Sequence, residues 1–127
     1  MVPGDGVPDL GAMMGKENIL HDLVTLVKVF DANYVTEEDS TKLIGLDVNQ
    51  EQGVGEAVSR LLLPEFLSYT GAAQARLLDS LKDALADPKE DFDRLFDRVE
   101  FAFDAPVKDR RRFIQALLRS LESAKGV

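Results

Sequence analysis

The segment from Glu56 to Tyr69 constrains the fold more than any other part of this sequence. It reads EAVSRLLLPEFLSY, and its apolar residues fall on nearly all sides of a helix. A helix of this kind is normally buried in a protein core. Pro64 interrupts it, because proline has no backbone N–H and clashes with the preceding helical turn. We therefore expect a central buried helix around residues 56–69 that is kinked or split at Pro64.

Apolar residues elsewhere recur at the spacing of amphipathic helices. Thr36 and Asn49 are suited to N-cap positions, and Gly45 is suited to the end of a helix. Pro88 and Pro106 each follow a short break and suit a first helical turn. The sequence predicts an all-α fold, an irregular antiparallel bundle of five to six helices. The predicted helices cover residues 17–32, 36–44, 50–69, 72–86, 88–104 and 106–124.

The beginning of the chain has a different composition. Glycine or proline occupies positions 3, 4, 6, 8, 11 and 15. Such a density of helix and strand breakers is typical of flexible segments. We therefore divide the chain into a flexible N-terminal leader, residues 1–15, and a single all-helical domain, residues 16–127.

Few residues are suited to metal binding or catalysis. The chain has no cysteine and one histidine, His21, which lies on the polar side of its predicted helix and is expected to be solvated. Transition metals would therefore need carboxylates alone as ligands. Asp31 and Asp47 each begin the spacing of a calcium-binding loop, but neither loop has the required glycine at its sixth position. We predict no cofactor, no metal site and no catalytic group.

The net charge of −8 limits the classes of partner. An acidic surface repels the phosphates of nucleic acids and of anionic membranes, so we expect neither as a partner. No apolar run approaches the roughly 18 residues of a membrane span. We see no secretory signal and expect a cytoplasmic protein.

Five acidic residues recur at alternating spacings of three and four within predicted helix 88–104. On a helix they form one continuous row, whose like charges repel one another. A basic stripe formed by Lys108, Arg112 and Arg119 in the next helix either covers this row, or the row stays open and binds a basic partner protein. The row comprises Glu90, Asp93, Asp97, Glu100 and Asp104.

Phe101 falls on the opposite side of the same predicted helix from Phe92 and Val99. Aromatic residues with neighbouring arginines are favoured at protein interfaces. Three alternatives remain open for this ring: a self-association or partner surface, burial within the chain, and simple exposure.

Three consecutive arginines, Arg110, Arg111 and Arg112, stand in the first turns of the last predicted helix, where positive charge opposes the helix dipole. Three explanations are open. Arg110 is paired with a carboxylate such as Asp104 or Asp109, or it lies at the open end of the bundle, or the run forms a cluster that holds an anion.

These observations favour a small, acidic, non-enzymatic interaction module of bacterial type, such as an inhibitor, an immunity-type protein or an adaptor. It would dock the acidic row and the Phe101 patch onto a basic protein surface. A structural homo-oligomer, such as a homodimer, is the main alternative, and a carboxylate-based enzyme or metal-binding protein is a third.

Overall fold

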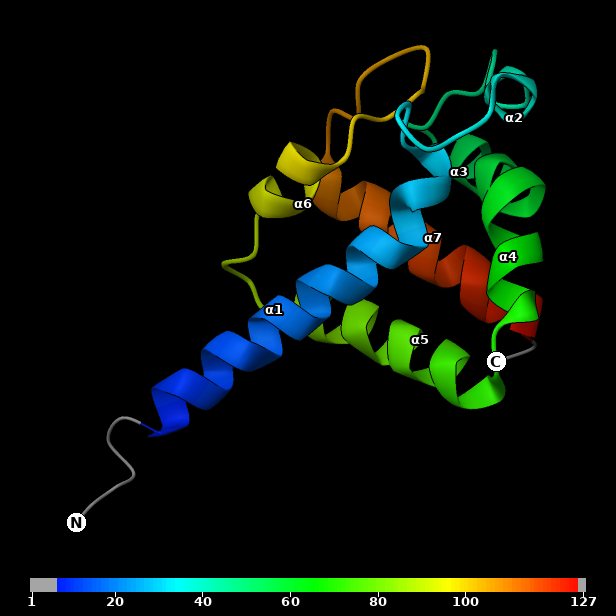
Figure 1. Cartoon of the computed structure of the whole chain (residues 1–127). Helices are drawn as coiled ribbons and strands as arrows, with labels where there is room; N and C mark the ends of the chain where they lie inside the picture. Colours follow the sequence, from blue (N-terminus) through cyan, green and yellow to red (C-terminus); the bar gives the residue numbers. More distant parts are fainter. Residues whose placement is uncertain (1–6, 126–127) are drawn as a thin grey trace.

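Helices form all of the regular secondary structure in this computed structural model, which describes residues 7–125 (Figure 1). For residues 7–14 and 16 it describes the backbone only. The prediction of an all-α bundle is confirmed. The elements are α1 (Val7–Val27), η2 (Lys28–Phe30), α2 (Glu37–Thr41), α3 (Glu51–Ala57), η3 (Val58–Leu62), α4 (Leu63–Ser68), α5 (Gly71–Ala86), α6 (Asp93–Arg98) and α7 (Arg110–Lys125).

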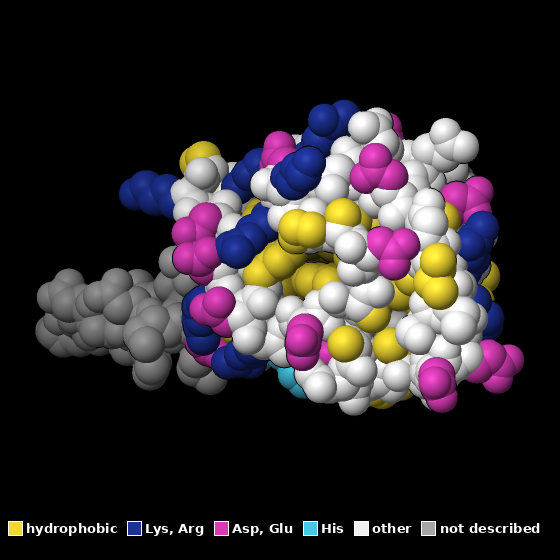
Figure 2. Space-filling model, turned by 90° about the horizontal axis from the view of Figure 1, so that it is seen from above, with side chains coloured by type: hydrophobic (Ala, Val, Ile, Leu, Met, Phe, Trp, Pro, Cys, Tyr) yellow, Lys and Arg dark blue, Asp and Glu magenta, His cyan; other side chains and the backbone are white. Residues whose placement is uncertain are grey.

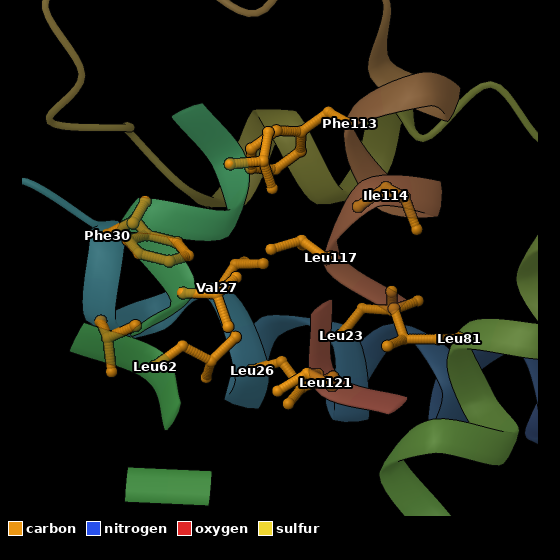
Figure 3. Close-up of a cluster of buried hydrophobic side chains, with 14 of the residues drawn as sticks. Leu23, Leu26, Val27, Phe30, Leu62, Leu81, Phe113, Ile114, Leu117 and Leu121 are labelled. Atoms are coloured by element: carbon orange, nitrogen blue, oxygen red, sulfur yellow. The ribbon is translucent and has the colours of Figure 1, made fainter. Parts of the chain in front are cut away.

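The core lies where α1, α5 and α7 meet. Helix α1 packs against α5, and α7 packs against both α5 and α3, while the connections around α2 and the loop between α6 and α7 lie at the top of the view in Figure 1. Apolar side chains from α1, η3, α5 and α7 converge in this core (Figure 3). Its fully buried members include Leu26, Leu81, Ile114, Leu117 and Leu121. Each such side chain stabilises the fold by roughly 1.5–3 kcal/mol relative to exposure.

The segment around residues 56–69 passes through three helical forms in succession. Helix α3 is followed by the π-helical η3, in which the Leu63 N–H reaches back to the Val58 carbonyl, and then by α4. Pro64 is the second residue of α4, directly after η3, within an unbroken run of helical residues. Leu61, Leu62 and Phe66 are buried.

Helix α1 begins well before the predicted start at residue 17. It starts at Val7, so the segment predicted as a flexible leader is helical from residue 7 onward. Glycine inside a helix costs roughly 1 kcal/mol relative to alanine, and Gly11 and Gly15 are both accommodated here. The remainder of the predicted leader, residues 1–6, lies outside the described residues.

The ends of the shorter helices agree with the sequence in one place and differ in two. Thr36 Oγ1 accepts a hydrogen bond from the backbone N–H three residues later at 3.0 Å. Helix α2 ends at Thr41, before the expected stop at Gly45, although Gly45 has a φ of 82° in the turn that follows. Asn49 was expected to cap α3, and this prediction is wrong. Its side chain instead accepts from the Lys108 N–H at 2.8 Å and donates to the Pro106 carbonyl at 3.0 Å, which ties the loop before α3 to the loop before α7.

The prediction of a helix over residues 88–104 is also wrong. Only Asp93–Arg98 is helical there, and Phe92 has a left-handed backbone with a φ of 62°. Side-chain oxygens of Asp87, Glu90 and Asp91 each accept a hydrogen bond from the backbone N–H two residues later. Such local bonds offer the backbone an alternative to helical hydrogen bonds.

After α6 the chain runs back across the end of α1. An isolated antiparallel bridge pairs Phe101 with Asp31, through hydrogen bonds from the Ala32 N–H to the Glu100 carbonyl at 2.7 Å and from the Ala102 N–H to the Phe30 carbonyl at 2.8 Å. The last helix then begins at residue 110 instead of 106. These bonds fix the loop that leads into α7.

Candidate functional site

The five acidic residues of the predicted row do not share a helix edge. Asp93 and Asp97 lie on α6, whereas Glu90 precedes it and Glu100 and Asp104 follow it. The prediction of one continuous carboxylate row is therefore wrong, because the helix that would have aligned these residues is only six residues long. The basic stripe therefore has no carboxylate row to cover.

The first acids of this group make contacts within the chain. Glu90 is half-buried, and its Oε2 accepts a hydrogen bond from the Phe92 N–H at 2.8 Å. Asp93 forms an ion pair with Arg110. Asp97 is exposed and has no ion pair within the described part of the chain.

Glu100 and Asp104 have a different role, because they join three loops. The Asn33 side-chain amide donates to Glu100 Oε2 at 3.3 Å. The Gly45 N–H donates to Asp104 Oδ2 at 2.7 Å. Both carboxylates remain exposed. Two acids of the predicted set are thus held at fixed positions on the surface.

The loop face is the surface formed by residues 31–36, 42–50 and 99–107, at the top of Figure 1. Figure 2 views the molecule from this side and shows a hollow lined with hydrophobic side chains, with acidic groups around it and basic groups gathered toward one edge. These loops carry two strongly exposed apolar residues, Tyr34 at 54% and Ile44 at 64%. They also contribute a set of half-buried apolar residues, namely Val35, Leu46, Ala102, Phe103 and Val107.

Sequence reasoning missed Tyr34 and Ile44. The only signal was a large apolar side chain inside a short polar connection, beside Asn33 in one case and Gly45 in the other. Tyr34 follows the residue that binds Glu100, and Ile44 precedes the residue that binds Asp104. The structure therefore places each exposed apolar side chain beside an anchored carboxylate.

Phe101 packs inside the molecule. Its ring stacks on Phe103 at a centroid distance of 5.3 Å and an interplanar angle of 12°, and it meets Phe113 edge-on at 5.6 Å. Phe96 and Phe30 complete this aromatic cluster. Burial within the chain is the alternative that the geometry favours, and the helical-wheel argument for an interface does not apply because Phe101 is not helical.

The run of three arginines does not form a single anion cluster. Arg110 pairs with Asp93, not with Asp104 or Asp109 as expected, and its guanidinium lies 4.7 Å from the centre of the Phe96 ring. Arg112 is exposed and points to a different surface. The three side chains diverge because consecutive helical residues project about 100° apart.

Arg111 binds backbone instead of an anion. Its guanidinium donates to the carbonyls of Leu85 at 2.8 Å, Asp87 at 2.7 Å and Glu90 at 2.9 Å. It also lies over the Phe92 ring, 5.6 Å from the centroid. One half-buried side chain on α7 therefore fixes the connection between α5 and α6.

A cleft of about 570 Å³ separates the start of α3 from α7. The basic stripe predicted from the sequence lines it, since Lys108, Arg112 and Arg119 all border this space beside Gln115. Arg119 pairs with Glu51 across the cleft at 2.6 Å. We call this space the basic cleft.

A third depression lies between the turn after η2 and the start of α4. Its lining includes Tyr34, Pro64 and Glu65. One carboxylate oxygen of Glu65 is buried without a hydrogen-bond partner. Burial, and next the Glu65 carboxylate, raise the pKa of the nearby Tyr69 phenol above its usual 10.0. The phenol therefore stays protonated at neutral pH.

The remaining titratable residues include an exposed histidine, His21, and a buried carboxylate, Asp22. No group of three or more potential metal ligands is found within the described part of the chain. His21 is exposed, as predicted. Asp22 is buried and accepts a hydrogen bond from Ser80 at 2.6 Å, with Arg76 at 3.5 Å, which links α1 to α5.

Comparison with known proteins gives no relative from which a function can be transferred. No family model, no curated protein and no solved structure matches the chain. Among the described helices, none has both the length and the apolar character needed to cross a bilayer.

Proposed function

We propose that this protein is a small, non-enzymatic binding module that docks through its loop face onto a basic surface of a partner protein in the cytoplasm. One observation carries the proposal. Tyr34 and Ile44, with exposed fractions of 54% and 64%, stand beside the surface carboxylates of Glu100 and Asp104 in loops that are hydrogen-bonded to one another.

This arrangement suits protein recognition for two reasons. Tyrosine is enriched among the residues that contribute most to binding at protein interfaces, and the exposed Ile44 side chain adds apolar surface that a partner can cover. Neighbouring carboxylates attract a basic partner and orient it during encounter. The role is that of an inhibitor, an immunity-type protein or an adaptor, as in bacterial systems.

The fixed loops reduce the entropy lost on binding. The bonds made by Glu100 and Asp104, together with the bridge between Asp31 and Phe101, hold residues 31–36, 42–45 and 99–104 together before any partner arrives. Immobilising a side chain at an interface costs about 0.5–1.5 kcal/mol, and a preformed surface avoids part of that cost.

Affinity capture with matched baits tests this proposal. The wild type is compared with a Tyr34→Ser/Ile44→Ser bait and with a Leu67→Ser control, which removes an apolar side chain of similar exposure (51%) from α4, outside the loop face. We expect a partner that the wild type and the control retain, that the double variant loses, and that elutes at high salt.

Two results would contradict the proposal. One is a partner that all three baits retain equally. The other is a stable dimer in light scattering that the double variant dissociates, because the loop face would then serve self-association, which is the homo-oligomer alternative.

A further inference from the structure

The basic cleft has the size and lining of a small-molecule site. Its volume of about 570 Å³ falls within the usual range of ligand pockets, roughly 300–1,000 Å³. Val48, Val54, Phe113 and Ala116 contribute apolar surface. Polar groups from the loop before α7 and from α7 itself border the same space. One part of the cleft can therefore hold an apolar body and another part a charged group.

The charge of the cleft contrasts with that of the whole chain. Four basic and two acidic side chains line it, which leaves a net charge of +2 in a protein whose net charge is −8. The basic members are Lys108, Arg111, Arg112 and Arg119, and the acidic members are Glu51 and Asp109.

Neither acid neutralises the centre of the cleft. Asp109 Oδ1 accepts a hydrogen bond from the Arg112 backbone N–H at 3.1 Å, so it caps α7. Glu51 binds one end of Arg119. Lys108 and the Arg112 guanidinium form no ion pair within the described residues, although they lie along one side of the same cleft.

Unneutralised positive charges at close spacing repel one another, and a bound anion removes that repulsion. A phosphate monoester carries about −1.5 to −2 charge at neutral pH, which matches the charge of the lining better than a single carboxylate does.

We infer that the basic cleft binds a small organic phosphate. Lys108, Arg112 and the free edge of the Arg119 guanidinium hold the phosphate, and the organic body lies on Val54 and Ala116. The cleft meets the loop face at Val48, Asn49 and Gln50, but neither Tyr34 nor Ile44 lines it, so different residues test the two proposals.

Backbone-amide NMR titrations of the full chain, at constant ionic strength, test the inference with three probes. Phenyl phosphate carries both an apolar body and a phosphate, inorganic phosphate lacks the body, and benzoate replaces the phosphate by a carboxylate. We expect saturable shifts centred on Lys108, Arg112 and Gln115 with phenyl phosphate, and at least about ten-fold weaker binding of either other probe, since one charged hydrogen bond is worth about 1.5–3 kcal/mol.

Substitutions at single residues test whether phenyl phosphate binds in the basic cleft. Arg112→Gln and Lys108→Gln are each expected to weaken phenyl phosphate binding by about ten-fold or more. Arg60→Gln is the matched control, because this exposed arginine lies outside the cleft and pairs with Glu56. If Arg112→Gln does not fold, Lys108→Gln still decides the matter, because Lys108 lies in the loop before α7.

Several outcomes would overturn the inference. Equal affinity for inorganic phosphate would mean a bare anion site, and equal affinity for benzoate would mean a carboxylate site. Shifts that do not saturate, or that Arg60→Gln weakens as much as Arg112→Gln does, would mean non-specific attraction. Capture of a protein partner by the Arg112→Gln bait bears on the loop face alone.

Discussion

Helix α5 and the connection from Asp87 to Asp109 follow one another in the chain but depend on different forces. Helix α5 begins at the Thr70 cap, runs through Ala86 and buries one apolar face, close to what its periodicity predicts. The connection has comparable apolar spacing, yet it forms only the six-residue α6. Periodicity alone therefore does not determine whether a segment is helical.

Contacts from elsewhere in the chain explain the difference. Asp87, Glu90 and Asp91 accept hydrogen bonds from nearby backbone N–H groups. Arg111 donates to three backbone carbonyls that would otherwise accept helical hydrogen bonds in a helix running on from α5. The aromatic side chains of the connection join a cluster with Phe30, which lies far away in sequence, and with Phe113 on α7. Helix α5 needs none of these contacts to form its turns.

Among the substitutions that test this contrast, Arg111→Ala is expected to have the largest effect on stability. It removes three hydrogen bonds from a charged donor and leaves carbonyls unpaired at the α5–α6 connection, so we expect a loss of about 3 kcal/mol in the free energy of unfolding. Urea unfolding measures the loss. The neighbouring Arg112→Ala, an exposed side chain, is the control and is expected to change stability by less than about 0.5 kcal/mol. Equal effects of the two variants would remove the assigned role of Arg111.

Phe101→Ala tests the aromatic cluster. The ring contacts Phe96, Phe103 and Phe113 but is only partly buried, so we expect destabilisation of about 2 kcal/mol, below the roughly 3–5 kcal/mol of a fully buried phenylalanine. The oligomeric state measured by light scattering should not change. An altered oligomer with unchanged monomer stability would restore the interface interpretation of this residue.

The same contrast explains which features of the structure can be predicted from the sequence. The all-α class, the cap at Thr36 and the grouping of Lys108, Arg112 and Arg119 on one surface rest on local spacing, and the structure has each of them. The stop expected at Gly45 is wrong, because α2 already ends at Thr41. Three other features depend on which loops contact one another: the surface that the stripe faces, the hydrogen bonds of Asn49 and the positions of the five acids. No local sequence pattern determines those contacts between loops.

Tyr34 and Ile44 show the same limit for the candidate site. Their exposure follows from the way three loops fold over one another, not from their own neighbours in sequence. By contrast, the five acids of the predicted row depend on a helical spacing that the chain does not adopt. The spacing predicts the acids on one helix, whereas the structure distributes them over α6 and the loops on either side of it.

Ser80→Ala tests helix α5, the regular helix of the comparison. Ser80 on α5 donates to the buried carboxylate of Asp22 on α1 at 2.6 Å. Its loss leaves a buried acceptor with the more distant Arg76 as its remaining partner, so we expect destabilisation of about 1 kcal/mol in urea unfolding. The exposed Ser123→Ala on α7 serves as the control, with an expected change near zero. An unchanged Ser80→Ala would mean that the packing of α1 on α5 is purely apolar.

The smallest effect gives the most direct comparison, because one substitution is made in both regions. Asp83 is exposed on α5, where alanine is the better helix former and where removing Asp83 also relieves its repulsion from Asp79, so Asp83→Ala should stabilise by about 0.5 kcal/mol. Asp91 instead accepts a hydrogen bond from the Asp93 N–H at 3.0 Å, so Asp91→Ala should destabilise by about 0.5 kcal/mol.

Opposite signs for the two alanine variants, measured as shifts in the urea midpoint at constant slope, would show that acids in the connection stabilise a non-helical backbone while acids in α5 merely tolerate a helical one. If Asp91→Ala also stabilised the protein, the local side-chain bonds would not oppose helix formation there. Arg111 and the aromatic cluster would then be the sole reason that the helix expected over residues 88–104 stops after a turn and a half.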